Sequence, residues 1–305
     1  MTTTRIEELS FDSADKFVEE IRLTSPRWGE SSWLFRGHWN ADWKLRPTAY
    51  RPEAWRRFGG LPEDYDEETG IDSTDFKELL VFAQGLDRHG IRIPGATRSR
   101  IDYLMHATLR PREWIEELAD LVALAQHYGF PTRLLDFTYQ SYVAAYFAAV
   151  ESAEARSAPN GKLCIWAIDT SVFNWSEQSP DWFKLVSATR AGNGSLVAQD
   201  GAFVVWEESR LTLDDLLAMT DPDPWREFRD VGHVPAGPTA RKLTLPQAEA
   251  PKLLGLLARE RITGARLFPG PLGVIRERIE QAHHKIHPAD RNYSAPPLDI
   301  RRTVE

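Results

Sequence analysis

The stretch QHYGFPTRLLDFTYQSYVAAYFAAV, residues 126–150, contains the junctions between a helix, a strand and a second helix. Phe130 and Pro131 end the preceding helix, because proline cannot continue one. Residues 134–138 are a short apolar run that predicts a strand, and Ser141 opens a segment with apolar residues at helical spacing. Polar side chains stand at each junction, so we expect this segment both to define the fold locally and to supply residues of a functional site.

Working outward from this segment, helical patterns dominate the first half of the chain, and short strand patterns are scattered through it. This order predicts an α+β fold, a single domain with a short split or bent sheet, mixed or antiparallel, flanked by helices. The predicted helices span residues 14–23, 73–86, 111–129, 141–155, 251–262 and 272–286. The predicted strands span residues 33–35, 134–138, 162–169, 202–206 and 241–245.

The domain organisation follows from composition along the chain. Residues 1–30 are predicted to form a helical lead-in, and residues 31–287 are predicted to form the α+β domain. Residues 52–72 are acidic and interrupted by Gly and Pro, which predicts a surface insertion. Residues 288–305 have no periodicity, which predicts an extended tail.

The overall composition is that of a globular protein, with 305 residues, 42% hydrophobic and 27% charged. A net charge of −8 makes the surface as a whole unsuited to collecting nucleic acid, so a basic site would have to be local. Cys164 is the single cysteine, which excludes an intramolecular disulfide and a thiolate metal cluster. Neither a leader pattern nor an apolar run long enough for a bilayer occurs, and we expect a cytoplasmic protein without membrane contact.

Three polar clusters accompany the predicted strands, namely FRGHW at residues 35–39, PTRLLDFT at 131–138 and AQDGAFVVW at 198–206. In the first, a guanidinium group beside a glycine suits a phosphate or pyrophosphate. A structural alternative is that Arg36 or Arg133 forms an ion pair with Asp136 and fixes the loops. No metal site is expected, because His127 is isolated and the neighbours His283 and His284 point to different sides of a helix.

The segments LFRGHW, ALAQHYGFPTRLLDFTYQSYVAAYFAA, AQDGAF and ITGARLFPGPLGVIRERI resemble the FRG-domain family. That family is named for a Phe/Tyr-Arg-Gly motif, here Phe35, Arg36 and Gly37. The resemblance runs from Ser31 to Ile279 and by itself implies little about mechanism.

A more distant resemblance links the chain to the ADP-ribosyltransferase superfamily, which consumes nicotinamide adenine dinucleotide (NAD). It implies that Arg36 contacts NAD, that Thr138 belongs to the hydroxyl-bearing strand of the nicotinamide pocket, and that Gln199 stands near the place of the catalytic glutamate. A neutral Gln199 cannot offset a developing positive charge, so Asp136, Asp200 or Glu207 would have to supply the carboxylate. We favour Asp136, which shares a strand face with Thr138.

These observations predict an NAD-consuming enzyme of the ADP-ribosyltransferase or NAD glycohydrolase type, and the resemblance allows a role as a toxin or defence effector. NAD would be the substrate, with no metal and with an unassigned macromolecular acceptor. The predicted catalytic residues are Arg36, Asp136, Thr138 and Gln199, and the predicted ligand contacts are Gly37, His38, His127, Tyr128, Arg133 and Tyr146.

The alternative is a non-catalytic FRG module that binds a nucleotide, a nucleic-acid end or a partner protein. Its positive charge would come from Arg46, Arg51, Arg56 and Arg57. Carbohydrate binding ranks last, because it rests only on 11 tryptophans.

Overall fold

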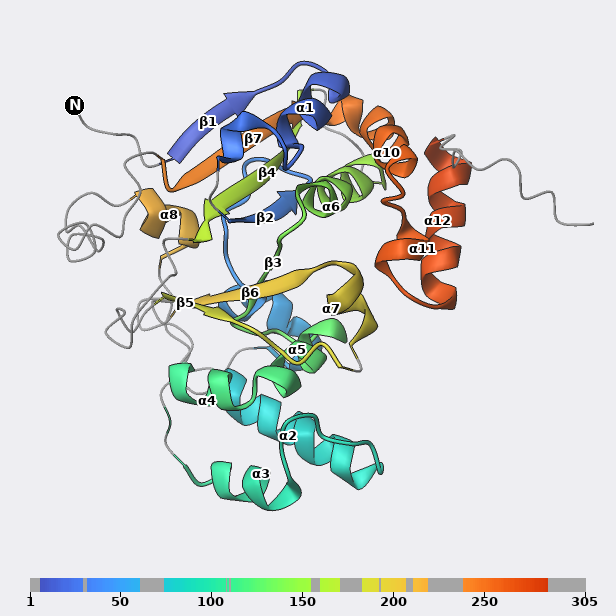
Figure 1. Cartoon of the computed structure of the whole chain (residues 1–305). Helices are drawn as coiled ribbons and strands as arrows, with labels where there is room; N and C mark the ends of the chain where they lie inside the picture. Colours follow the sequence, from blue (N-terminus) through green and yellow to red (C-terminus); the bar gives the residue numbers. More distant parts are fainter. Residues whose placement is uncertain are drawn as a thin grey trace, which may run out of the picture.

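The computed structural model describes residues 6–29, 32–60, 74–107, 109, 111–154, 160–170, 183–191, 193–206, 211–218 and 238–284. Within these ranges the chain is a single mixed α/β domain in which helices flank a seven-stranded sheet (Figure 1). No described helix combines the length and the apolar character needed to cross a membrane.

The sheet has the strand order β1-β7-β4-β2-β3-β6-β5. Only β1 and β7 pair in parallel, and the other neighbours are antiparallel. The strands are β1 (Ile6–Ser10), β2 (Trp33–His38), β3 (Leu135–Thr138), β4 (Lys162–Asp169), β5 (Phe183–Val186), β6 (Gly201–Trp206) and β7 (Ala240–Pro246).

The sequence of strand β4 shows why helices cover both faces of the sheet. Its sequence KLCIWAID is apolar in nearly every position, the pattern of a strand buried on both sides. Leu163, Ile165 and Ala167 join one hydrophobic core, and Cys164 and Trp166 join the other. The alternating side chains of one strand therefore anchor two separate helical layers.

Helices form these two layers. In Figure 1, α1, α6 and α10 lie together beside the β1-β7-β4-β2 part of the sheet, and α2 to α5 gather beyond β6. The helices are α1 (Ala14–Ile21), α2 (Thr74–Arg88), α3 (Arg98–Leu104), α4 (Pro111–Glu117), α5 (Ala119–His127), α6 (Ser141–Glu154), α7 (Gly194–Ala198), α8 (Leu213–Ala218), α10 (Ala250–Arg259), α11 (Gly264–Leu267) and α12 (Pro271–His284). Short 3₁₀ helices are η1 (Pro26–Trp28), η2 (Thr48–Tyr50), η3 (Pro52–Phe58) and η5 (Gln247–Glu249).

The junction between β2 and β3 divides the sheet. These strands share a single residue pair, Phe35 with Thr138. By contrast, β2 pairs with β4 continuously from Trp33 to His38. The four strands on one side and the three on the other are thus joined over a very short contact within one sheet.

Two predictions about the helices are wrong. The segment 111–129 is not one helix, because Leu118 leaves the helical conformation with φ −107° and ψ 21° and separates α4 from α5. Apolar residues on both sides of Leu118 pack into the same core, so tertiary packing decides the break. The helix predicted to run to residue 262 ends at Arg259, and Gly264 begins α11 instead of ending a helix.

The expected surface insertion at 52–72 is described only in part. Its first residues form η3, and Trp55 is buried there with its ring nitrogen Nε1 donating to the carbonyl oxygen of Ala49 at 2.9 Å. Trp55 therefore anchors this portion to the core, while residues 56–59 are exposed. Residues 61–73, like the predicted tail at 288–305, lie outside the described residues.

Candidate functional site

A pocket of about 350 Å³ lies where the sheet divides, with walls from β2, β3, β6, α5, α6 and α7. Its volume is at the lower end of the range of about 300–1,000 Å³ typical of small-molecule sites. The four residues predicted to be catalytic all line this pocket: Arg36, Asp136, Thr138 and Gln199. Stretches far apart in the sequence therefore meet in one place.

Arg36 bridges the two parts of the sheet. Its Nη1 donates a hydrogen bond to the main-chain oxygen of Asp136 at 2.7 Å and lies 3.7 Å from the Asp136 carboxylate. Its Nε donates to Nε2 of His38 at 3.0 Å. Burial lowers the pKa of Arg36, and the negative charges of Asp136 and Glu151 oppose this effect. A guanidinium group remains charged under these conditions, so Arg36 brings a fixed positive charge to the pocket.

His38 accepts a hydrogen bond from Arg36 but does not itself line the pocket. Its side chain is buried, which lowers its pKa to about 3, and the positive charges of Arg36 and Arg51 contribute further. A neutral imidazole can accept the hydrogen bond from Arg36. The ligand contact predicted for His38 is thus replaced by an interior role that orients the arginine.

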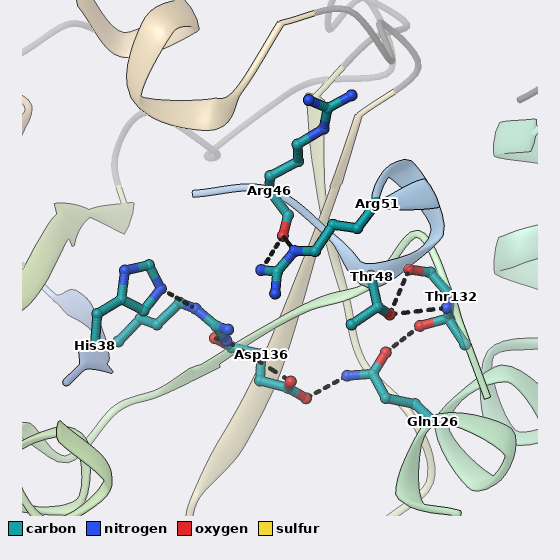
Figure 2. A network of polar contacts seen from close by, with 8 residues as sticks. His38, Arg46, Thr48, Arg51, Gln126, Thr132 and Asp136 are labelled. Carbon is teal, nitrogen blue, oxygen red and sulfur yellow. Dashed lines mark hydrogen bonds and ion pairs between the residues drawn. The ribbon is translucent and has the colours of Figure 1, made fainter. Parts of the chain in front are cut away.

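A chain of polar contacts holds Asp136 from the other side (Figure 2). The Asp136 carboxylate accepts a hydrogen bond from the amide of Gln126, and Gln126 accepts one from the hydroxyl of Thr132. Thr132 in turn exchanges hydrogen bonds with Thr48. The Asp136 side chain nevertheless remains 60% exposed, so its position is fixed while one side stays open to a ligand.

Thr138 and Gln199 form a wall of the pocket and connect β3 to the end of α7. The Thr138 hydroxyl donates to the main-chain oxygen of Gln199 at 2.6 Å and accepts from the main-chain N–H of Gln140 at 3.0 Å. The side-chain amide of Gln199 donates to the main-chain oxygen of Leu267 at 3.1 Å. These polar groups therefore shape the pocket through main-chain contacts.

Glu151 is a pocket residue that sequence reasoning missed. It lies on α6 and lines the pocket together with Ala144 and Phe147, at the spacing of one helix face. The single acid on this otherwise apolar face was the available signal. Of the other carboxylates considered, Asp200 does not line the pocket and pairs with Arg190 at 2.9 Å, and Glu207 lies outside the described residues.

The predicted ligand contact Arg133 belongs to the interior instead. Its guanidinium group forms two contacts with the Asp75 carboxylate, Nε to Oδ2 at 2.5 Å and Nη2 to Oδ1 at 2.9 Å. Burial by itself lowers the pKa of Arg133, but the Asp75 charge raises it above its ordinary value. The ion pair considered between Arg133 and Asp136 is therefore formed with Asp75, an acid supplied by α2.

The remaining predicted contacts divide between pocket, surface and core. Gly37 and His127 line the pocket, although the glycine is required by α6, because an added Cβ would lie 1.9 Å from the main-chain oxygen of Ala144. Tyr128 is 74% exposed and does not line it. Tyr146 is fully buried and donates its hydroxyl hydrogen to Glu280, so it serves the core and not a ligand.

The family comparison covers the part of the chain from β2 to α6. The model of the FRG domain matches residues 31–157. This part of the chain is therefore similar to the FRG domain. The FRG match includes the Phe35-Arg36-Gly37 motif, Asp136 and Thr138 but ends before Gln199, whereas the resemblance seen in the sequence extends to Ile279. No curated protein and no solved structure gives a significant match to the chain.

The pocket offers charge and hydrogen bonds to a ligand. Within the described ranges, no group of three or more His, Cys, Asp or Glu side chains is arranged to hold a metal ion. The charged groups that line the pocket include the Arg36 guanidinium and the carboxylates of Asp136 and Glu151. Such a set can bind an anionic group at one point and stabilise positive charge at another.

Proposed function

We propose that the protein is an NAD-consuming enzyme of the ADP-ribosyltransferase or NAD glycohydrolase type. One observation carries this proposal, namely that Arg36 and two carboxylates line a single pocket, where β2 and β3 share only one residue pair. A fixed cation suits the pyrophosphate of a dinucleotide. A carboxylate can stabilise the positive charge that develops at the ribose carbon when nicotinamide departs.

The reaction breaks the bond between ribose C1′ and the nicotinamide nitrogen, and nicotinamide leaves with the electron pair. Positive charge develops on the ribose ring, and a nearby carboxylate stabilises it. Water or the nucleophile of an acceptor then bonds to C1′ and loses a proton. Asp136 is our first candidate for the carboxylate, because its position is fixed by Gln126 while its side chain stays 60% exposed. Glu151 is the second candidate.

The experiment measures nicotinamide released from NAD by the purified protein, with and without protein acceptors. The variants are Asp136→Asn and Glu151→Gln, and Glu8→Gln on the exposed part of β1 is the matched control. We expect the substitution at the functional carboxylate to slow release roughly a hundredfold, as for removal of a key charge-stabilising group. The control should match the wild type. Absence of release by the wild type under all these conditions would refute the proposal.

One observation favours the second candidate, a non-catalytic FRG module that binds a nucleotide. The polar groups of Thr138 and Gln199 already bond to main-chain atoms, and Gln199 is neutral. Calorimetry separates the two functions. Binding of NAD without any release of nicotinamide would support the module, whereas turnover lost in Asp136→Asn or Glu151→Gln would support the enzyme.

A further inference from the structure

The chain between β2 and η3 carries a second arginine that the proposed function does not use. Arg51 follows η2 and is partly buried. Its Nε and Nη2 both donate to one acceptor, the main-chain oxygen of Arg46, at 3.0 and 2.5 Å. These two bonds fix the plane of the guanidinium group. The third nitrogen, Nη1, has no hydrogen-bond partner among the described residues.

Arg51 lies in the electrostatic neighbourhood of Arg36. Burial lowers the pKa of Arg51, and the charge of Arg36 lowers it further. The effects of Glu53, which raises this pKa, and of Arg46, which lowers it, are smaller. Both arginines also contribute to the low pKa of His38. Figure 2 shows the Arg51 guanidinium group turned into the space between His38, Asp136 and Thr48.

The hydrogen-bond partners of the two arginines are neutral. Arg51 bonds to a main-chain oxygen, and Arg36 bonds to an uncharged imidazole and to another main-chain oxygen. The carboxylate of Asp136 lies 3.7 Å from Arg36 and is shared with Gln126. Two partly buried cations without a close bidentate carboxylate repel one another, and an anion placed between them removes this repulsion.

We propose that Arg51 and Arg36 form a phosphate-binding subsite beside the pocket, which takes the phosphate or pyrophosphate group of a nucleotide. Arg36 lines the pocket and Arg51 lies outside its lining. The subsite deepens the proposed function and rests on it for the identity of the rest of the ligand. Arg46 contributes its main-chain oxygen, and Figure 2 shows its side chain pointing away from Asp136.

Calorimetry with inorganic pyrophosphate, ADP and adenosine tests the subsite. Arg51→Gln should weaken binding of pyrophosphate and ADP about 10- to 100-fold, the effect of a lost hydrogen bond to a charged group. Adenosine should bind equally to both proteins, and binding of the two anions should weaken with salt. Arg46→Gln is the matched control, since it removes a neighbouring charge but keeps the main-chain oxygen. It should weaken binding of the anions less than Arg51→Gln does, because it removes a nearby charge without removing a hydrogen bond to the ligand.

A second measurement uses the wild-type protein and does not depend on the folding of a variant. Phenylglyoxal modifies accessible arginines, and mass spectrometry follows each site. Pyrophosphate should slow modification of Arg51 and Arg36 and leave the exposed Arg57 unchanged. Equal modification of Arg51 with and without pyrophosphate would overturn the subsite.

The outcomes distinguish the subsite from the enzyme activity. Pyrophosphate binding that depends on Arg51, in a protein that releases no nicotinamide, supports the subsite and refutes only the activity. Turnover of NAD that responds equally to Arg51→Gln and Arg46→Gln overturns the subsite and leaves the activity standing. A wild-type protein that binds neither pyrophosphate nor ADP also overturns the subsite.

Discussion

Arg133 and Arg36 both lie beside β3, yet their surroundings differ. Arg133 precedes the strand and forms a two-point ion pair with Asp75, and both side chains are at most 3% exposed. Arg36 lies on β2, and its side chain reaches β3. Its hydrogen bonds are accepted by a main-chain oxygen of β3 and by a neutral histidine of β2. Its carboxylate partner, Asp136, is 60% exposed and 3.7 Å away.

The difference separates an arginine that serves the fold from one that, in the proposed function, binds a ligand. A buried charge destabilises the folded state unless a partner compensates it closely, and Asp75 does so for Arg133. The charge of Arg36 is only partly compensated, and burial lowers its pKa. An anionic ligand in the pocket would complete the compensation that the chain leaves incomplete.

The largest expected effect comes from breaking the pair that serves the fold. Asp75→Asn keeps the shape of the side chain but leaves the buried Arg133 cation without its charge partner. The free energy of unfolding should fall by about 3–5 kcal/mol. Urea denaturation measures this change. A loss below about 1 kcal/mol, the range of exposed pairs, would show that the pair does not stabilise the fold.

The next effect concerns the strand that carries Arg36. In Gly37→Ala the new Cβ would lie 1.9 Å from the Ala144 oxygen and 2.8 Å from the Ala148 nitrogen, both main-chain atoms of α6. We expect β2 and α6 to separate at a cost of about 1–3 kcal/mol in urea denaturation. Gly255→Ala is the control, because its Cβ meets no atom within 4 Å. Equal stability of the two variants would contradict the close packing of β2 on α6.

The third effect is a pH dependence that originates at His38. The pKa of His38 is about 3 in the folded protein, whereas its ordinary value, which applies to the unfolded chain, is 6.5. Between these two pH values the unfolded chain therefore binds more protons than the folded protein. The stability that neutral His38 contributes is therefore lost as pH falls below 6.5, at up to about 1.4 kcal/mol per pH unit. His38→Gln removes the titrating group, so the variant should lose less stability than the wild type between pH 7 and pH 4.5. Parallel losses in urea denaturation would exclude a buried, neutral His38.

The smallest effect comes from the exposed partner of Arg36. Asp136→Asn should lower the free energy of unfolding by less than about 1 kcal/mol, because the side chain is exposed and the ion pair is long. The same substitution is expected to act mainly on the pocket, in contrast to Asp75→Asn. A loss of stability as large as that of Asp75→Asn would place both arginines in the same structural class.

The sequence predicts the central strands and helices well, because their own residues determine them. The predicted strand at residues 162–169 coincides with β4, since a run that is apolar on both faces fits no exposed element. The helix predicted at 141–155 is confirmed as α6. By contrast, β1 with the sequence IEELS lies at the sheet edge, and its pairing with β7 rather than its own pattern makes it a strand. The break at Leu118 likewise depends on packing that no local pattern records.

For the site, the polar residues that accompany the short strands were the useful signal, although β2 extends to His38, so that Arg36 lies inside the strand and not at its end. The pocket is lined by all four residues predicted from this signal, namely Arg36, Asp136, Thr138 and Gln199. Their catalytic roles stay predictions. The partner of Arg133 could not be predicted, because Asp75 is 58 residues away in the sequence. Glu151 could not be assigned either, since its place in the pocket depends on how α6 docks against β2.

The most direct test of the difference between the two arginines is the rise in melting temperature that NAD produces in the wild type and in Arg36→Gln. Ligand binding to the folded state raises the melting temperature by an amount that grows with the ratio of free ligand to its Kd. We predict a rise in the wild type that is absent in Arg36→Gln, while the ligand-free variant melts within a few degrees of the wild type. A variant that keeps the full rise, or that is already as unstable as Asp75→Asn, would contradict the assignment of Arg36 to the ligand.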